Sequence, residues 1–314
     1  MIICTLCRRR EAFFFRAYSG ERLCRRCFCL SIERKVKTAI SKYGMFEPDD
    51  RIAVAVSGGK DSLSLLHILS KIEKSFPKAT LTAVIVDEGI KGYRDEAMKI
   101  AKKNCEKSDV GHIIVSFKEL YGYALDEIAE MTEDTKLTPC SYCGVLRRRA
   151  INTAAKLAGA SKVATAHNLD DETQTALLNI IHGDPIRILR VKPILDPIQP
   201  GLVQRVKPLC EVPEREVALY AYVKKIAFQS LPCPYSGSAL RNDVRGILNR
   251  LEEKHPGMKY TIHRSMEKIR SLLEQSNLKT SLSNCGKCGA PTVGNICQTC
   301  QILEALKRGQ TSSV

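Results

Sequence analysis

The stretch that decides the fold is IAVAVSGGKDSLSLLHIL, residues 52–69. Five apolar residues predict a buried strand, the glycine pair predicts a tight turn, and the apolar pattern after it predicts a helix. Backbone N–H groups of such a turn and the positive end of the helix form a phosphate site, which glycines allow to approach closely. The spacing fits neither the Walker pattern nor the dinucleotide fingerprint. The residues predicted to bind phosphate are Ser57, Gly58, Gly59, Lys60, Asp61 and Ser62.

The alternation of strands and helices continues beyond this stretch. Further apolar runs at 80–86, 112–117 and 162–166 are separated by helical patterns. That order is typical of a parallel sheet wrapped by helices. We therefore predict an α/β fold with a doubly wound parallel sheet. The segment 182–209, which holds five prolines, predicts an ordered excursion that carries substrate or interface contacts.

The composition favours a nucleic-acid partner. The chain has 314 residues, with 49 Lys and Arg against 34 Asp and Glu, so its formal net charge is +15. Such a balance attracts polyanions through counterion release, although a generally basic enzyme is an alternative. No apolar run reaches the roughly 20 residues that a membrane span needs, and no signal peptide is recognisable. We expect a cytoplasmic protein without a membrane partner.

Most of the 14 cysteines occur in C-x-x-C pairs, which indicates metal binding in a reduced compartment. Two sets of four thiols each suit one tetrahedral zinc ion. They are Cys4, Cys7, Cys24 and Cys27 near one end, and Cys285, Cys288, Cys297 and Cys300 near the other. The expected division is an N-terminal zinc ribbon at 1–30, a linking helix at 31–50, a core at 51–278, and a C-terminal ribbon with its tail at 279–314.

The phosphate loop resembles the S-G-G-x-D-S loop of the PP-loop ATP pyrophosphatases. That family holds the β- and γ-phosphates of ATP while a substrate oxygen attacks the α-phosphate. Two further segments, VDEGI at 86–90 and TAHNLDDETQT at 165–175, resemble its nucleotide-side motifs. The alternative for the second segment is a simple helix start, capped by Asn168 and Asp170. The resemblance places Val86, Asp87 and His167 at the nucleotide, Lys60 at the phosphates, and Asp61 and Asp171 near Mg2+.

The stretch PCSYCGVLRRR, residues 139–149, contains a further pair of cysteines whose role has to be assigned. Its two thiols allow half of a zinc site, a redox dithiol, or a three-thiol iron–sulfur site completed by Cys233 in LPCPYSG. Both zinc ribbons already look complete, and the arginines do not recreate the context of a thioredoxin motif. Cys29, Cys105 and Cys210 are left over and suit burial as small apolar residues, with Cys29 also an alternative ligand in the first ribbon.

Taken together, these motifs resemble the TtcA/TtuA family of tRNA thiolases. That family combines C-x-x-C-G-x-x-[KR]-R, a later cysteine before Pro-Tyr-Ser, paired zinc ribbons and the phosphate loop. The resemblance implies a [4Fe-4S] cluster held by Cys140, Cys143 and Cys233. It implies a phosphate or transition-state contact for Arg147, at a position that is often lysine, with Arg148 as a second candidate. A planar guanidinium then replaces a point charge.

The implied activity is ATP-dependent 2-thiolation of a tRNA uridine, at the wobble position or in the T-loop. ATP adenylates the C2 oxygen, and sulfur then displaces AMP. The implied cofactors are ATP, Mg2+, the cluster and two Zn2+. The implied partners are tRNA, a sulfur donor that is either a ubiquitin-like thiocarboxylate carrier or free sulfide, and a second copy in a homodimer.

Three alternatives remain open from the sequence. The cysteines can act through a persulfide and a disulfide without a cluster. The protein can be a different PP-loop enzyme, such as the ligase that adds lysine to a tRNA cytidine, which has no need of the three thiols. It can also be a zinc-ribbon RNA-binding protein whose nucleotide site regulates binding without chemistry.

Overall fold

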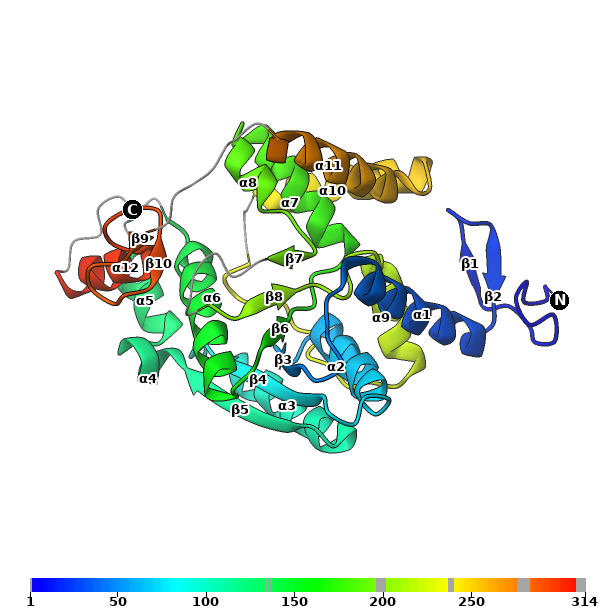
Figure 1. Ribbon diagram of the computed structural model, residues 1–314, viewed down its shortest axis with the longest axis horizontal. Coiled ribbons are helices and arrows are strands. Elements are labelled where there is room, and N and C mark those ends of the chain that lie inside the picture. The colour runs from blue at the N-terminus through cyan, green and yellow to red at the C-terminus, as the bar shows by residue number, and fades with distance from the viewer. Residues whose placement is uncertain are drawn as a thin grey trace.

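The structure is a computed structural model that describes residues 2–133, 135, 137–195, 202–236, 240–275 and 283–308. Within these residues the central sheet has six strands in the order β5-β4-β3-β6-β8-β7 (Figure 1). Neighbouring strands are parallel except for β7, which runs antiparallel to β8. The predicted parallel sheet is thereby confirmed. The strands are β3 (Arg51–Ala55), β4 (Thr80–Asp87), β5 (Gly111–Ser116), β6 (Lys162–Ala164), β7 (Ile194–Leu195) and β8 (Gln204–Val206).

Helices cover both faces of the sheet, and further helices form a layer beyond its edge (Figure 1). One face carries α1 (Arg25–Tyr43), α2 (Lys60–Glu73), α3 (Arg94–Ser108) and α9 (Glu214–Val223). The opposite face carries α4 (Phe117–Tyr121), α5 (Leu125–Met131) and α6 (Pro139–Leu157). The outer layer consists of α7 (Leu169–Ile181), α8 (Pro185–Leu189), α10 (Leu240–Lys254) and α11 (Met258–Gln275).

The alternation of side chains along β3 explains how both faces are filled. Ile52 and Val54 pack into the apolar core beneath α2, whereas Ala53 packs into the core beneath α6. Successive strand residues point to opposite faces, so one apolar run serves two cores. The small side chains of Ala53 and Ala55 let α6 lie close to the sheet.

The N-terminal ribbon pairs β1 (Phe14–Arg16) with β2 (Glu21–Leu23) in an antiparallel hairpin. The following helix begins at Arg25, inside the stretch assigned to the ribbon, whereas the expected linking helix begins at 31. The reason is local: Cys24 is the N-cap, and its sulfur accepts a hydrogen bond from the Cys27 N–H at 3.5 Å. The second cysteine pair therefore both completes the set of four thiols and starts the helix.

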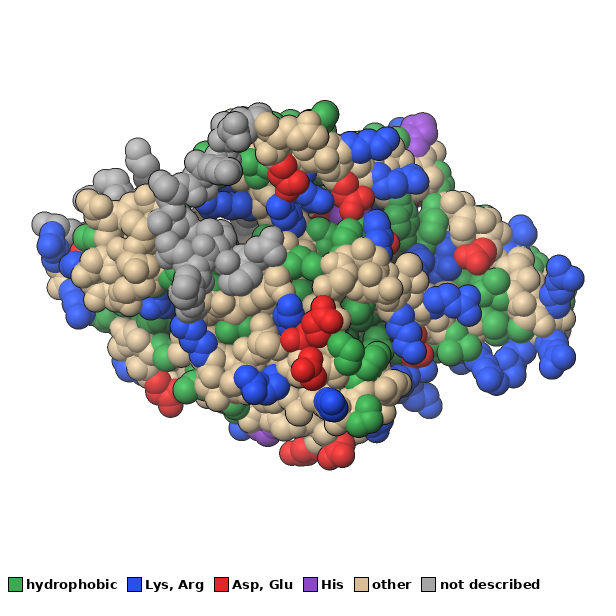
Figure 2. All heavy atoms as spheres, in the orientation of Figure 1, with side chains coloured by type: hydrophobic (Ala, Val, Ile, Leu, Met, Phe, Trp, Pro, Cys, Tyr) green, Lys and Arg blue, Asp and Glu red, His purple; other side chains and the backbone are tan. Residues whose placement is uncertain are grey.

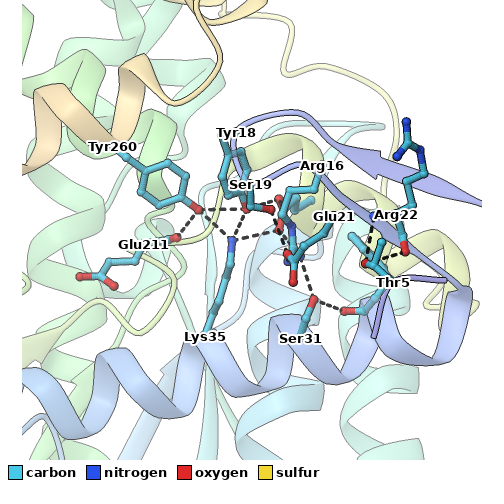
Figure 3. Close-up of polar contacts among 12 residues, drawn as sticks. Thr5, Arg16, Tyr18, Ser19, Glu21, Arg22, Ser31, Lys35, Glu211 and Tyr260 are labelled. Carbon is cyan, nitrogen blue, oxygen red and sulfur yellow. Dashed lines mark hydrogen bonds and ion pairs between the residues drawn. The ribbon is translucent and has the colours of Figure 1, made fainter. Parts of the chain in front are cut away.

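A buried polar network fastens this ribbon to the core (Figure 3). Arg16 forms a two-point contact with Glu216 of α9, with both distances 3.0 Å. Figure 3 shows Lys35 of α1 reaching between Tyr18 of the ribbon and Tyr260 of α11, to both of which it donates hydrogen bonds. Because Arg16 and Glu216 are almost fully buried, breaking this pair would leave an uncompensated charge. The ribbon is thus held in a fixed orientation.

The C-terminal ribbon is not a free appendage. Its hairpin of β9 (Ser283–Asn284) and β10 (Pro291–Thr292) leads into α12 (Gln298–Lys307). Ile302 and Leu306 of α12 are buried in the same apolar cluster as Cys143 and Leu146 of α6. The two ribbons lie at opposite ends of the long axis (Figure 1).

Two expectations about this region lie outside the described residues: the boundary between 278 and 279, and the end of the tail at 309–314. No helix in the described part of the chain is long and apolar enough to cross a membrane.

Candidate functional site

The phosphate loop has the geometry of an anion site. Gly58 has a φ of +89°, and a Cβ atom there would lie 2.5 Å from the carbonyl oxygen of Ala97 in α3. Gly59 is the N-cap of α2, and no side chain of the described residues caps this helix. The N–H groups of its first turn are therefore available to a phosphate. Ser62 closes the loop, since its hydroxyl accepts from the Ser57 N–H at 3.1 Å.

The lysine of the loop lies between carboxylates. Lys60 Nζ is 2.8 Å from Asp61 Oδ2 and 2.8 Å from Glu214 Oε1 at the start of α9. Asp61 also accepts from the Asn168 amide at 3.3 Å. Glu214 was not predicted, because it lies far along the chain in no recognisable motif. A phosphate that enters the loop has to compete with these carboxylates for Lys60.

The segment at 165–175 combines a helix cap with a carboxylate at the site. Asn168 caps α7, and its side chain accepts from the Asp171 N–H at 3.1 Å, as the alternative interpretation predicted. Asp170 has a different role: it accepts from the Glu214 N–H at 2.8 Å and pairs with Lys259 of α11. Asn168 donates hydrogen bonds to both Asp171 and Asp61, so the two carboxylates predicted near Mg2+ are neighbours.

Asp171 has a pKa of about 6. Burial raises the pKa, the hydrogen bond from Asn168 partly opposes this effect, and the charge of Asp61 raises it further. The folded protein therefore binds a proton at Asp171 more tightly than the unfolded chain does. Its stability falls as the pH rises from about 4 to about 6, and the penalty stays constant at higher pH.

We expect Asp171→Asn to stabilise the protein in the absence of nucleotide, by on the order of 1 kcal/mol at pH 7.5. The amide keeps an oxygen that can accept from Asn168 but carries no charge. Thermal melts between pH 5 and pH 8 in saturating zinc should show an advantage that grows up to about pH 6 and then levels. A variant no more stable than the parent at pH 7.5 would contradict the assignment of a charge penalty to Asp171.

A small pocket of about 50 Å³ lies beside the loop on the α6 face of the sheet. It is lined by the ends of β3 and β4, including Ala55 and Val86, and by Arg147 and Ile151 of α6. Asp87, predicted to contact the nucleotide, accepts from the Gly89 N–H at 2.9 Å in the turn after β4. The pocket therefore combines apolar walls with a guanidinium, that of Arg147, among its lining side chains.

A continuous chain of contacts joins the phosphate loop to a cysteine of α6. Arg94 donates to the Ser57 carbonyl at 2.5 Å and pairs with Glu88 at 2.8 Å. Glu88 pairs through its other oxygen with Arg147 Nε at 2.7 Å. Arg147 Nη2 is in turn 2.9 Å from the sulfur of Cys143. Glu88 and Arg94 were missed as site residues because only the folded chain reveals their partners.

The segment that carries Cys233 approaches the same place from another direction. The Gln229 N–H donates to the Gly58 carbonyl at 2.9 Å, four residues before Cys233. The sulfur of Cys140 lies 2.9 Å from the Tyr235 carbonyl oxygen, two residues after it. Burial raises the pKa of Cys143 to about 11 against the opposing charge of Arg147. Burial raises the pKa of Cys140 as well, and the charge of Cys233 adds to this effect.

The three thiols differ in spacing from the two sets of four. All four sulfurs of each ribbon lie within 4.8 Å of one another, and Cys29 belongs to neither set. In the ribbons, the Cys7–Cys24 sulfurs are 3.9 Å apart and the Cys288–Cys297 sulfurs 3.6 Å. A tetrahedral zinc ion with Zn–S bonds of about 2.3 Å requires about 3.8 Å. The described part of the chain shows no such tight grouping of Cys140, Cys143 and Cys233.

An iron–sulfur cluster does not require such close spacing, because its thiolates bind separate iron atoms. Two N–H groups, from Arg9 and Arg10, lower the pKa of Cys7 to about 6, which favours the thiolate that zinc needs. The donor sets therefore suit metals of two kinds: one ion at each ribbon and a larger group at the trio.

His167 lies at the end of β6 and is hydrogen-bonded through Nδ1 to the Thr165 hydroxyl at 2.9 Å. Although the His167 side chain is exposed, the protein atoms around it disfavour its charged form and lower its pKa to about 3, and the charges of Lys207 and then Arg205 add to this effect. The ring is therefore neutral at physiological pH. It can accept or donate a hydrogen bond to a nucleotide but supplies no charge.

Comparison with known proteins agrees with these features. Residues 29–251 match the family described as the PP-loop domain. A probable sulfurtransferase of Methanocaldococcus jannaschii is 40% identical over 300 residues, covering 95% of this chain and 86% of that protein. A cytoplasmic tRNA 2-thiolation protein 1 of Chlamydomonas reinhardtii is 37% identical over 308 residues, covering 98% and 85%.

A solved structure supports the same relationship over the whole fold. The U34-tRNA thiolase NcsA from Methanococcus maripaludis, described with its [4Fe-4S] cluster, superposes with a TM-score of 0.84 at 34% identity. The match covers 98% of this chain and 97% of that one. The resemblance to the thiolases is confirmed. The chain therefore belongs to the PP-loop family of tRNA 2-thiolation proteins.

Proposed function

We propose that this protein is an ATP-dependent tRNA sulfurtransferase that converts the wobble uridine to 2-thiouridine. The observation that carries the proposal is the chain of contacts from Ser57 through Arg94, Glu88 and Arg147 to Cys143. It links a site for ATP phosphates to a thiol in a single cleft. The choice of the wobble position follows the related thiolase described as acting on U34.

In the first half-reaction, the loop at 57–62 holds the β- and γ-phosphates. Lys60 leaves Glu214 to meet them, and Asp61 and Asp171 would hold an Mg2+ ion that neutralises phosphate charge. The uridine C2 oxygen then attacks the α-phosphorus, a P–O bond forms, and pyrophosphate leaves. Val86 and His167 border the nucleoside. Arg147, held by Glu88, places its charge where the α-phosphate gains negative charge.

In the second half-reaction, a sulfide attacks C2 of the adenylated uridine, and AMP leaves with the former C2 oxygen. Cys140, Cys143 and Cys233 hold a [4Fe-4S] cluster in this proposal. When bound, a cluster with three protein thiolates supplies one iron that is free to carry the sulfur atom. Arg147 donates toward Cys143 and favours its thiolate form, which a metal ligand requires. The relative with its cluster supports this assignment.

Each terminal ribbon binds one Zn2+ in this proposal, and the N-terminal ribbon contacts tRNA. Figure 2 shows Lys and Arg side chains gathered around the end of the molecule that this ribbon forms. Arg8, Arg9 and Arg10 are all exposed there. The sulfur donor, a ubiquitin-like thiocarboxylate carrier or free sulfide, and the homodimer rest on the family resemblance alone. The name of the Chlamydomonas relative supports a cytoplasmic location.

The deciding experiment is an anaerobic reaction of reconstituted protein with ATP, sulfide and unmodified tRNA. Mass spectrometry of the tRNA nucleosides should find 2-thiouridine at the wobble position, with one AMP released for each sulfur incorporated. Release of AMP with a lysine-modified cytidine would identify a ligase. Binding of tRNA without any AMP would identify a regulated binding protein.

A further inference from the structure

Two arginines beside the thiol-bearing half of α6 lack a counter-charge. Arg148 of α6 is exposed, and Arg205 of β8 is half-buried. The Nε atom of Arg205 is buried and has no hydrogen-bond partner. Among the described residues neither guanidinium pairs with a carboxylate. The guanidinium of Arg205 is partly removed from water, which is costly unless an anion compensates its charge, and the exposed Arg148 is free to share such an anion.

The fold places the two side chains against each other. The Asn152 amide oxygen of α6 accepts from the Val203 N–H at 2.9 Å, which fixes the helix over the start of β8. The helix α6 leads into β6, and β6 and β8 are parallel. The chain direction of α6 is therefore opposite to that of both strands. Arg148 lies four residues before Asn152, about 6 Å along the helix. Arg205 lies two residues after Val203, about 7 Å in the same direction.

The face of β8 that carries Arg205 is the face that α6 covers. Residues two apart in a strand share a face, so Arg205 points as Val203 does. Val203 packs against the apolar cluster beneath α6. Val163, which pairs with Arg205 in the sheet, is buried in the same cluster. Arg148 and Arg205 therefore project together from the edge of this core toward the cleft.

The electrostatics agree with this placement. Burial lowers the pKa of Arg205, and the charge of Arg148 lowers it further. Arg241, at the start of α10, donates to the Thr175 hydroxyl of α7 at 3.1 Å and adds its charge near His167. The charges of Arg148, Arg205 and Arg241 all act on the same imidazole, His167, so three cations from α6, β8 and α10 lie near one another. An anion bound between them would relieve their mutual repulsion.

We propose that Arg148 and Arg205, flanked by Arg241, bind a phosphodiester of the substrate RNA next to the reacting uridine. The inference rests on the proposed function and specifies how the site holds its RNA. The ATP phosphates are an unsuitable occupant, because their loop follows β3, two strands from β8 and roughly 10 Å away. A nucleotide in a single-stranded loop carries a phosphate on each side of its ribose. A base inserted beside Cys143 therefore brings one to this wall of the cleft.

The test measures binding of an anticodon stem-loop RNA by fluorescence anisotropy at several salt concentrations. Arg148→Gln and Arg205→Gln should each weaken binding about tenfold, the usual effect of losing a charge-assisted hydrogen bond. Each should also reduce the slope of log affinity against log salt by about 0.7. Arg205→Lys should restore part of the affinity. Lys156→Gln, an exposed site two turns further along α6, is the matched control and should change neither quantity by more than the general loss of one charge.

A neutral methylphosphonate at the phosphates flanking the target uridine gives the sharper readout. It should weaken binding to the parent protein but have little further effect on Arg148→Gln, a site exposed enough that folding is not at risk. Weakened ATP binding with unchanged RNA binding would overturn the inference in favour of a nucleotide phosphate. Additive losses from methylphosphonate and substitution would also overturn it. Thiolation by the parent protein is scored separately, so a failure of the proposed function is seen independently of these affinities.

Discussion

Replacing Cys143 with alanine is expected to abolish tRNA thiolation, by at least roughly a thousandfold, while ATP binding stays within a factor of about three. A three-thiolate site that loses one ligand cannot keep a cluster with a single open iron, and even the loss of a group that only orients a metal ligand typically costs about 10- to 100-fold. The substitution does not touch the phosphate loop. The measurements are 2-thiouridine formation, iron content, and the anaerobic visible spectrum.

Cys105→Ala is the matched control for this experiment. Cys105 is fully buried in α3, and burial raises its pKa to about 11, as it does for Cys143. It belongs to neither zinc set nor to the trio. We expect its variant to keep its iron and its activity, with a small loss of stability from the smaller side chain. Full thiolation by Cys143→Ala would exclude the three-thiol site as the place of sulfur transfer.

Replacing Gly58 with alanine is expected to weaken ATP binding roughly a hundredfold. An alanine there must adopt a φ of +89°, and its Cβ atom meets the Ala97 carbonyl oxygen at 2.5 Å. Strain of this kind costs about 3 kcal/mol, which is roughly two orders of magnitude in affinity when binding has to restore the geometry. The shift also disturbs the Gln229 contact that leads to Cys233. Calorimetric titration with ATP measures the effect.

Gly122→Ala separates the two causes of this effect. Gly122 has a φ of +84° at the end of α4, yet a Cβ atom there meets nothing within 4 Å. We expect a stability loss of about 1 kcal/mol from the backbone alone and unchanged ATP affinity. Equal losses of ATP affinity in both variants would mean that the close approach to α3 is not what shapes the phosphate loop.

The sequence was most informative where a short local motif determines the structure. The apolar runs before the phosphate loop and at 80–86 gave the strands, because parallel strands are buried on both faces. The C-x-x-C pairs gave the metal sets, because their spacing alone brings two thiols together. The strands β7 and β8 were missed because they are two and three residues long in a segment rich in proline.

The rest of the site could not be predicted because its partners are distant in sequence. Glu88 belongs to the site because it pairs with Arg94 and Arg147. The sequence around Glu214 likewise gives no sign that Lys60 is its partner. Arg205 stands out because no carboxylate of the described residues pairs with it, and this can be recognised only once the fold is known. Convergence in three dimensions, rather than residue type, made these side chains part of the site.

If the C-terminal ribbon binds zinc as proposed, the packing of α12 on α6 would link that zinc indirectly to catalysis. Cys297 is the N-cap of α12, and the zinc that Cys297 and Cys300 would bind therefore anchors the helix whose apolar side supports Cys143. A cell short of zinc would then lose sulfur transfer without any change at the nucleotide. The supply of zinc would then limit a reaction that is carried out with iron and sulfur.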